Sequence, residues 1–251
     1  MKRMDGLFRD EFRYEQTHMK LISDTESTFI TAKKAVLHSR SLLGQYISKH
    51  SEFLTSLEPL ELDLNAPEFI RKMMGAGIDA NVGPMASVAG GLAEVATNAM
   101  IHRGSTQAMA DNGGDISIMG ELAPVVGIYA GEHSIAKRVG LKIRSTDLPL
   151  GICTSAGVLG HSISFGSADA VIVFARSAFL ADASATAIAN HVKTTDTEGT
   201  IQNALEVAEC IRGVHGCMIF LGMEVGTCGW VPEFAEVIEG KNELMIERSH
   251  D

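Results

Sequence analysis

The stretch from Pro149 to His191, PLGICTSAGVLGHSISFGSADAVIVFARSAFLADASATAIANH, decides the fold. Two apolar runs lie in it: one ends at Thr154, and the other, from Ala170 to Ala175, is rich in β-branched residues, which is typical of buried strands. After the first run we expect a polar turn over residues 154–157, whose hydroxyls and amides can hold an anion. A helix of small residues follows the second run. The stretch therefore predicts strand, turn, strand and helix in that order.

Asp182 and Thr186 stand four residues apart in the expected helix, so they share one of its faces. A carboxylate and a hydroxyl are hard oxygen ligands that suit Mg²⁺, which also takes waters and substrate phosphates. The helix N-terminus would add a favourable dipole for phosphate. The alternative is structural, because an Asp in a first turn often caps a helix and a mid-helix Thr often bonds a preceding carbonyl. Spacing alone leaves both open.

Two glycine pairs are further candidates for ligand contact. Residues 107–119 predict a hairpin whose tight turn contains Asn112, Gly113 and Gly114, since these residue types tolerate positive φ. Such a turn needs no ligand, but it also lets one approach the backbone, and the acidic residue after it, Asp115, can contact a metal or a ribose. In the helix expected over 84–102, Gly90 and Gly91 each cost about 1 kcal/mol relative to alanine, so we expect close packing there, either with another helix or with a nucleotide. Glu94 and Asn98 on the same helix point either into a pocket or to water.

His161 and Cys153 are the candidates for proton and sulfur chemistry. A histidine such as His161, with an ordinary pKa near neutrality, can donate a proton or polarise a phosphate, or simply hold a turn by a hydrogen bond. Cys153 is either a small buried apolar residue or a thiolate that carries sulfur. The sequence leaves these alternatives open.

In order along the chain, these motifs resemble the ApbE-like flavin transferases, and in particular the branch found in methanogenic archaea and sulfate reducers. The resemblance covers roughly residues 80–192 and rests on Asp111-Asn112-Gly113-Gly114-Asp115, Cys153-Thr154-Ser155-Ala156-Gly157, His161, and Ala181-Asp182-Ala183-Ser184-Ala185-Thr186. That family uses Mg²⁺ to move the FMN half of FAD onto a protein Ser or Thr. The resemblance implies a T-fold-like architecture.

The resemblance also implies roles for single residues. Asp182 and Thr186 would hold Mg²⁺, residues 112–115 would pack against the nucleotide, and Thr154 and Ser155 would line its phosphate side. The sequence departs from the family pattern at two cofactor contacts. Residues 164–166, Ser-Phe-Gly, stand where Asp-Pro-Arg is expected, and residues 89–93 carry glycine where the family has a lysine.

Composition and charge limit the classes of function. A chain of 251 residues that is 45% hydrophobic can bury one sizeable core, and we expect a single domain over 1–251. The formal net charge of −10, without a basic block, argues against binding to nucleic acid or to anionic membranes. Four sparse cysteines predict reduced thiols in a cytoplasm, and the absence of an 18-residue apolar run predicts no membrane span.

The alternation of hairpins with helices predicts an α+β fold with a mainly antiparallel sheet and helices packed on one face. We expect a hairpin over 12–31 that turns at residues 23–26, a strand over 216–225 that extends the sheet, and a short helix over 232–238. Unpaired sheet edges, together with the apolar run from Cys217 to Val225, predict a homo-oligomer.

Three functional hypotheses follow from these patterns. The first is metal-assisted binding of FAD or a related diphosphate, with FMN transfer to a protein substrate. The second is a sulfur-handling protein of anaerobic cysteine or homocysteine synthesis, in which Cys153 accepts a persulfide. The third is a binding scaffold without turnover. Loss of nucleotide binding on Asp182→Ala would favour the first, and loss of sulfur transfer on Cys153→Ser would favour the second.

Overall fold

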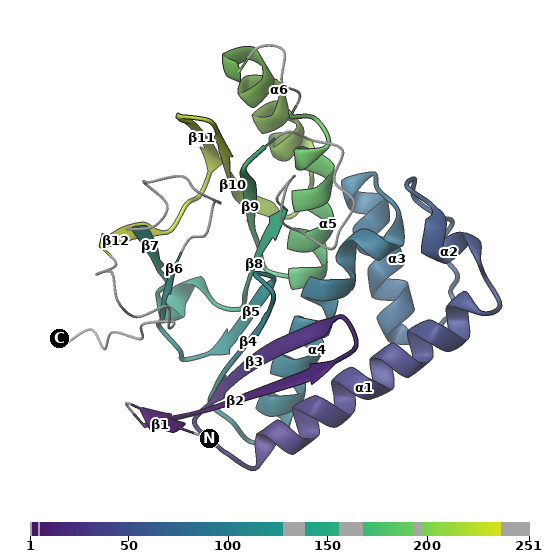
Figure 1. Ribbon diagram of the computed structural model, residues 1–251, viewed down its shortest axis with the longest axis vertical. Helices are drawn as coiled ribbons and strands as arrows, with labels where there is room; N and C mark the ends of the chain where they lie inside the picture. Colours follow the sequence, from purple (N-terminus) through teal and green to yellow (C-terminus); the bar gives the residue numbers. More distant parts are fainter. Residues whose placement is uncertain (1, 5, 128–138, 156–167, 193–196, 237–251) are drawn as a thin grey trace.

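A nine-stranded antiparallel sheet forms the centre of the computed structural model, which describes residues 2–4, 6–127, 139–155, 168–192 and 197–236 (Figure 1). Its order is β1-β2-β3-β4-β5-β8-β9-β10-β11, and every neighbouring pair is antiparallel. The strands are β1 (Lys2–Met4), β2 (Leu7–Tyr14), β3 (Thr17–Ser23), β4 (Gln107–Asn112), β5 (Ile116–Gly120), β8 (Leu150–Ser155), β9 (Ala170–Ala175), β10 (Val214–Leu221) and β11 (Glu224–Gly229).

The helices cover one face of this sheet and a second, small sheet lies on the other side (Figure 1). The helices are α1 (Thr28–Ile47), α2 (Glu52–Thr55), α3 (Glu68–Ala80), α4 (Val88–His102), α5 (Ala178–Ala189) and α6 (Thr197–Cys210), with 3-10 turns at Pro84–Ser87 and Ser145–Asp147. The small sheet has the order β12-β7-β6, from β12 (Glu233–Glu236), β7 (Val139–Lys142) and β6 (Val125–Gly127). The predicted α+β class, with an antiparallel sheet and helices on one face, is confirmed.

The central stretch folds largely as its residue pattern predicts. Every residue of β9 is buried, because this strand lies between the two cores of the molecule. The small residues of α5 let the helix backbone approach the sheet: a Cβ added at Gly151 on β8 would lie 2.6 Å from the Cα of Ala178. Thr154 and Ser155 belong to the end of β8 rather than to a turn, and residues 156–157 of the expected turn lie outside the described residues.

The predicted hairpin over 12–31 is wrong, because the hairpin in the structure is formed by β2 and β3 over residues 7–23 and the expected second strand is helical. β2 and β3 pair from Tyr14 and Thr17 onward, so the turn lies at residues 15–16 rather than 23–26. Residues 28–31 form the start of α1, although their β-branched side chains are typical of a strand. The helical spacing of the buried residues Phe29, Ala32 and Val36 decides the outcome, since these side chains fill the core under the sheet.

The remaining strand predictions have mixed outcomes. The hairpin over 107–119 is confirmed as β4 and β5, with φ of +74° at Gly113 and +104° at Gly114. The run 216–225 contains a turn after Leu221 and therefore supplies two strands, β10 and part of β11, that extend the sheet. The short helix expected over 232–238 is wrong, because residues 233–236 form β12 and pair with β7.

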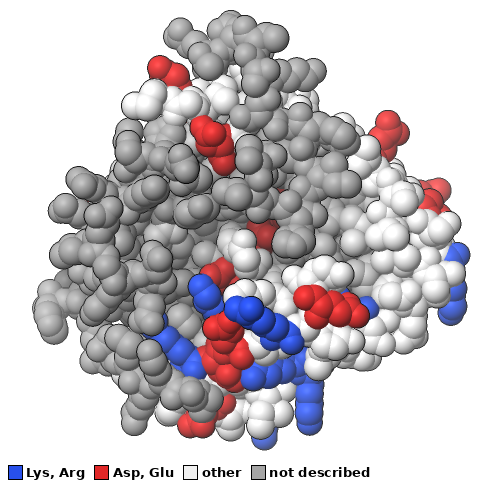
Figure 2. All heavy atoms as spheres, viewed as in Figure 1, with Lys and Arg blue, Asp and Glu red and all other residues white. Residues whose placement is uncertain are grey.

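Figure 2 shows acidic side chains in both halves of one face of the molecule and basic side chains in its lower half. In its lower half, where Figure 1 places β2, β3 and α1, blue and red side chains lie close together. Lys33 pairs with Asp10 at 2.7 Å, and Arg40 contacts Glu15. In the parts of the chain that the structure describes, no helix is both long enough and apolar enough to cross a membrane.

Candidate functional site

The crossing of α4 over α5 brings the predicted metal-ligating residues to the centre of the molecule. A Cβ added at Gly90 on α4 would lie 2.3 Å from the carbonyl oxygen of Ala178 and 2.8 Å from the Cβ of Asp182. A Cβ at Gly91 would lie 2.4 Å from the ring of Phe179. Both glycines are therefore explained by helix packing, one of the two alternatives that the sequence left open.

Asp182 is buried and points from α5 toward the first turn of α4. Its Oδ2 accepts a hydrogen bond of 2.8 Å from the amide of Gly90, and the amide of Ala89 also donates to this carboxylate. Burial nevertheless raises the pKa of Asp182 from 3.8 to about 7. Thr186 lies one turn further along α5 and is also buried, so the carboxylate and the hydroxyl share one side of the helix, as their spacing predicts.

Asp115 comes from the other side of the site, between β4 and β5. Its Oδ1 accepts a 3.3 Å hydrogen bond from the amide of Thr154, and it also accepts one from the thiol of Cys153. Burial, followed by the negative charge of Asp182, raises the pKa of Asp115 well above its ordinary value. Two carboxylates from distant parts of the chain therefore lie close enough to repel each other. A cation would relieve that repulsion.

The glycine turn between β4 and β5 lies beside the start of α4. The side-chain amide of Asn112 donates to the carbonyl of Ala89 at 3.2 Å, and the backbone amide of Asn112 donates to the carbonyl of Asp115 at 3.0 Å. A Cβ added at Gly113 or Gly114 would meet no atom of the described residues within 4 Å. The turn is thus fixed to the helix by Asn112, and no described residue covers its two glycines, so their backbone is a candidate for contact with a ligand.

The end of β8 carries two hydroxyl groups: Ser155 faces the helices, as Cys153 does, whereas Thr154 faces the opposite side of the sheet. Thr154 is half-buried, and its amide is held by Asp115. The Oγ of Ser155 is buried and has no hydrogen-bond partner in the described residues, and the Oγ of Ser184 on α5 is buried and unpaired in the same sense. A buried hydroxyl without a partner is a costly feature that a bound oxygen-rich group would satisfy.

Cys153 lies beneath the carboxylates, with its Sγ 3.5 Å from the carbonyl oxygen of Ala178. Burial, followed by the negative charges of Asp115 and Asp182, raises the pKa of its thiol well above the ordinary value. The thiol is therefore protonated at neutral pH, which opposes the reactivity that a persulfide carrier needs. His161 lies outside the described residues.

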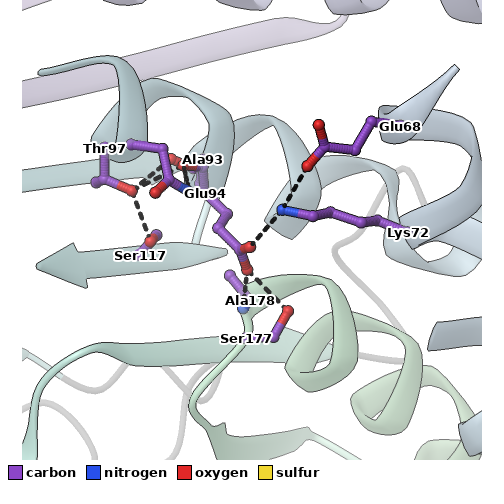
Figure 3. Close-up of polar contacts among 9 residues, drawn as sticks. Glu68, Lys72, Ala93, Glu94, Thr97, Ser117, Ser177 and Ala178 are labelled. Carbon is purple, nitrogen blue, oxygen red and sulfur yellow. Dashed lines mark hydrogen bonds and ion pairs between the residues drawn. The ribbon is translucent and has the colours of Figure 1, made fainter. Parts of the chain in front are cut away.

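Glu94 has a role that its sequence position did not reveal. Figure 3 shows its side chain reaching from α4 to the start of α5, where its Oε2 accepts hydrogen bonds of 2.8 Å from both the hydroxyl of Ser177 and the amide of Ala178. Lys72 on α3 lies 3.6 Å from its Oε1. The N-terminus of α5 thus already has a carboxylate partner, so the helix dipole there is not free for a phosphate as the sequence suggested.

Glu94 and Asp182 form a reciprocal pair of helix caps. Glu94 on α4 accepts from the first turn of α5, and Asp182 on α5 accepts from the first turn of α4. The only sequence signal for this arrangement is the spacing of Gly90 and Glu94, one helical turn apart. Because the donors come from segments about 90 residues away, the pairing follows from the tertiary packing and not from a local pattern.

The geometry limits which metal sites are possible. Within the described ranges, no group of three or more His, Cys, Asp or Glu side chains is arranged to hold an ion. Asp115 and Asp182 instead bring two carboxylates near each other, and Thr186 adds a hydroxyl one helical turn from Asp182 on α5. Such an incomplete oxygen set suits Mg²⁺, which keeps waters and takes ligands from substrate phosphates.

Comparisons with known proteins agree with this fold. The family model described as AbpE bacteria matches residues 5–222. A UPF0280 protein of Methanococcus maripaludis is 39% identical over 228 residues, covering 90% of this chain and 92% of that one. A UPF0280 protein of Methanocaldococcus jannaschii is 39% identical over 231 residues, covering 91% and 93%. The chain therefore belongs to this ApbE-like family, as its motifs indicated.

Two solved structures share the fold at low sequence identity. The flavinyl transferase ApbE of Pseudomonas stutzeri, in its apo form, has a TM-score of 0.58 at 10% identity and covers 91% of this chain and 97% of its own. A mutant of the flavin transferase ApbE of Vibrio cholerae has a TM-score of 0.56 at 12% identity, covering 90% and 97%. These similarities establish the architecture of the chain, and its chemistry has to be argued from its own residues.

Proposed function

We propose that this protein binds FAD or a related nucleotide diphosphate through Mg²⁺ held by Asp182 and Thr186, and that it transfers the FMN half to a Ser or Thr of a protein substrate. The observation that carries the proposal is the pair of close carboxylates, Asp115 and Asp182, whose pKa values burial raises. Two such groups are costly in the absence of a cation. A divalent cation compensates both charges at once.

The residues around the carboxylates fit the rest of the ligand. A carboxylate has about four lone-pair directions, so the hydrogen bond from Gly90 to Oδ2 of Asp182 leaves acceptor capacity for a cation. The hydroxyl of Ser155, which has no partner among the described residues, would bond phosphate oxygens at the end of β8, and the adjoining Thr154 would line this end of the strand. The open glycine turn, Gly113 and Gly114, would contact the nucleotide through its backbone.

The chemistry is a phosphoryl transfer. Bound Mg²⁺ supplies neutralisation of the diphosphate charge. A hydroxyl of the protein substrate attacks phosphorus and gives up its proton to water, a phosphoester bond to FMN forms, the phosphoanhydride bond breaks and AMP leaves with its electron pair. Asp115 keeps the end of β8 in place through the amide of Thr154, and the contacts of Asp182 with α4 keep the two sides of the site together.

The proposal is tested by calorimetric titration of FAD into the protein with and without Mg²⁺. Thr186→Val keeps the shape of this buried side chain and removes only its oxygen, so metal-dependent binding should fall at least about tenfold. Thr31→Val on α1 is the matched control and should bind as the unchanged protein does. Binding that is equal with and without Mg²⁺, or unaffected by Thr186→Val, would contradict the proposal. No binding at all would favour a scaffold without turnover.

The sulfur-handling hypothesis has weaker support from the geometry. Cys153 is fully buried, and the negative carboxylates beside it disfavour the thiolate. Its thiol instead donates a hydrogen bond to Asp115, which is a positioning contact for the metal site. We further propose that a single domain over 1–251 acts in the cytoplasm on a nucleotide and a protein substrate, and that the chain self-associates through its sheet edges.

A further inference from the structure

Three of the four cysteines lie in one row across the sheet. Cys153 on β8 is opposite Val173 on β9, Val173 is opposite Cys217 on β10, and Cys217 is opposite Cys228 on β11. Opposed residues of neighbouring strands point to the same face of a sheet, and here this is the face covered by the helices. The row therefore runs from the carboxylate site to the edge strand of the sheet.

Only one pair in this row can form a disulfide bond. Directly opposed residues of antiparallel strands have Cα atoms about 4.5 or 5.5 Å apart, and both values lie within the roughly 4.4–6.8 Å that a disulfide spans. Cys217 and Cys228 meet this condition, and both are free thiols. Cys153 and Cys217 are two strands apart, or about 9.5 Å, and the side chain of Val173 lies between them.

The two thiols of this pair differ in accessibility and in acidity. Cys217 is fully buried, whereas Cys228 lies on the edge strand and is partly exposed. A hydrogen bond from Cys217 lowers the pKa of the Cys228 thiol below its ordinary value, although burial and the charge of Glu209 on α6 act in the opposite direction. The same hydrogen bond, together with burial, raises the pKa of Cys217. This asymmetry is typical of a dithiol with one attacking and one resolving cysteine.

We propose that Cys217 and Cys228 form a redox-active dithiol site that reacts with low-molecular-weight disulfides. The thiolate of Cys228 attacks one sulfur of the small disulfide and releases one small thiolate, which takes up a proton. Cys217 then loses its proton and attacks the sulfur of Cys228, which releases the second small thiol and closes the intrachain bond. The protein dithiol is oxidised by two electrons, and the small disulfide is reduced to two thiols.

The product would tie the edge strand β11 covalently to β10. Before oxidation, β11 is held by its pairing with β10 and by contacts with α6, among them a 3.8 Å contact from the Sγ of Cys228 to the carbonyl oxygen of Leu205. The site is separate from the carboxylates by two strands, so the reaction does not depend on the proposed nucleotide binding.

The proposal is tested by incubating the folded, reduced protein with oxidised glutathione, counting its thiols and mapping its disulfides by peptide mass spectrometry. The unchanged protein should lose the thiols of residues 217 and 228 together, with these two residues joined in one peptide pair. Cys217→Ser should instead stop at a stable mixed disulfide between glutathione and Cys228. Cys210→Ser removes an exposed thiol outside the pair and should form the same intrachain bond as the unchanged protein does.

Two results would overturn the proposal: glutathione attached only at Cys210, or intrachain bond formation that is unchanged in Cys217→Ser. Because Cys217 is buried, Cys217→Ala serves as a second variant in which no polar group replaces the thiol. Circular dichroism of each variant establishes that it is folded before its thiols are counted. A mixed disulfide at Cys228 in both variants, and none there in the unchanged protein, is the expected pattern.

Discussion

The cost of a buried charge at Asp182 gives the sharpest prediction. Asp182→Asn keeps the shape of the side chain and one acceptor oxygen for the amide of Gly90 but removes the charge. In the folded protein burial raises the pKa of Asp182 from 3.8 to about 7, a difference of roughly three pH units, and each unit is worth about 1.4 kcal/mol. Ionising this carboxyl in the metal-free fold therefore costs up to about 4 kcal/mol.

The sign of the effect follows from proton binding. At a pH between the pKa of Asp182 in the unfolded chain and its pKa in the fold, the folded protein holds a proton that the unfolded chain has lost. The free energy of unfolding therefore falls as pH rises from about 4 to about 7. The asparagine side chain of the variant is neutral throughout and would not show this loss. We expect Asp182→Asn to stabilise the metal-free protein at pH 8 by about 1–4 kcal/mol. The range is wide because an amide oxygen accepts hydrogen bonds more weakly than a carboxylate, which offsets part of this stabilisation. Near pH 4 the substitution should change stability little.

Urea unfolding, followed by circular dichroism with a chelator present, measures this difference at both pH values. Asp79→Asn is the matched control, because Asp79 is exposed and pairs with the exposed Arg212 at 3.5 Å, so its effect should stay below about 1 kcal/mol. Adding Mg²⁺ at pH 8 should stabilise the unchanged protein and leave Asp182→Asn unaffected. A variant that is less stable than the unchanged protein at pH 8 would contradict this prediction, because it would show that the charge is already compensated without a cation.

Three further predictions address the packing and the proposed metal. Gly90→Ala should destabilise the fold by about 1–3 kcal/mol, since its Cβ would lie 2.3 Å from a carbonyl oxygen, whereas Gly75→Ala on α3, with open space at its Cβ, should be neutral or stabilising in thermal unfolding. Glu94→Gln should cost about 1–3 kcal/mol in urea unfolding, because the first turn of α5 would lose a charged acceptor; an unchanged midpoint would rule out the capping role. The affinity for Mg²⁺ should rise with pH through about 7, as protons compete less at Asp182; calorimetry in buffers of different ionisation enthalpy should detect proton release on binding below that pH, and a flat profile would contradict this.

The sequence predicted those parts of the fold whose signals are local. The β-branched run over 170–175, the small-residue helix that contains Asp182, and the Asn112-Gly113-Gly114 turn each carry their own pattern, and the structure has each element where it was expected. Residues 28–31 misled the strand prediction, because the burial of Phe29 at helical spacing outweighed their β propensity. Residues 233–236 form a strand only because β7 is there to pair with them.

The sequence indicated which residues belong to the candidate site but not how they contact one another. The spacing of Asp182 and Thr186 is a property of one helix, so it could be read directly from the sequence. The approach of Asp115 to Asp182 and the capping of α5 by Glu94 join segments 67 and 84 residues apart, and they depend on how α4 crosses α5. Cys217 and Cys228 likewise became a pair only through the register of β10 and β11.

The most direct test of the proposed function is a crystal structure of the protein grown with FAD and Mn²⁺, a stand-in for Mg²⁺ that is located by its anomalous scattering. The account predicts one ion bound between the carboxylate of Asp182 and the hydroxyl of Thr186, with the diphosphate oxygens of FAD completing its ligands near Ser155. An ion bound elsewhere, or FAD bound without an ion at Asp182 and Thr186, would contradict the proposed function.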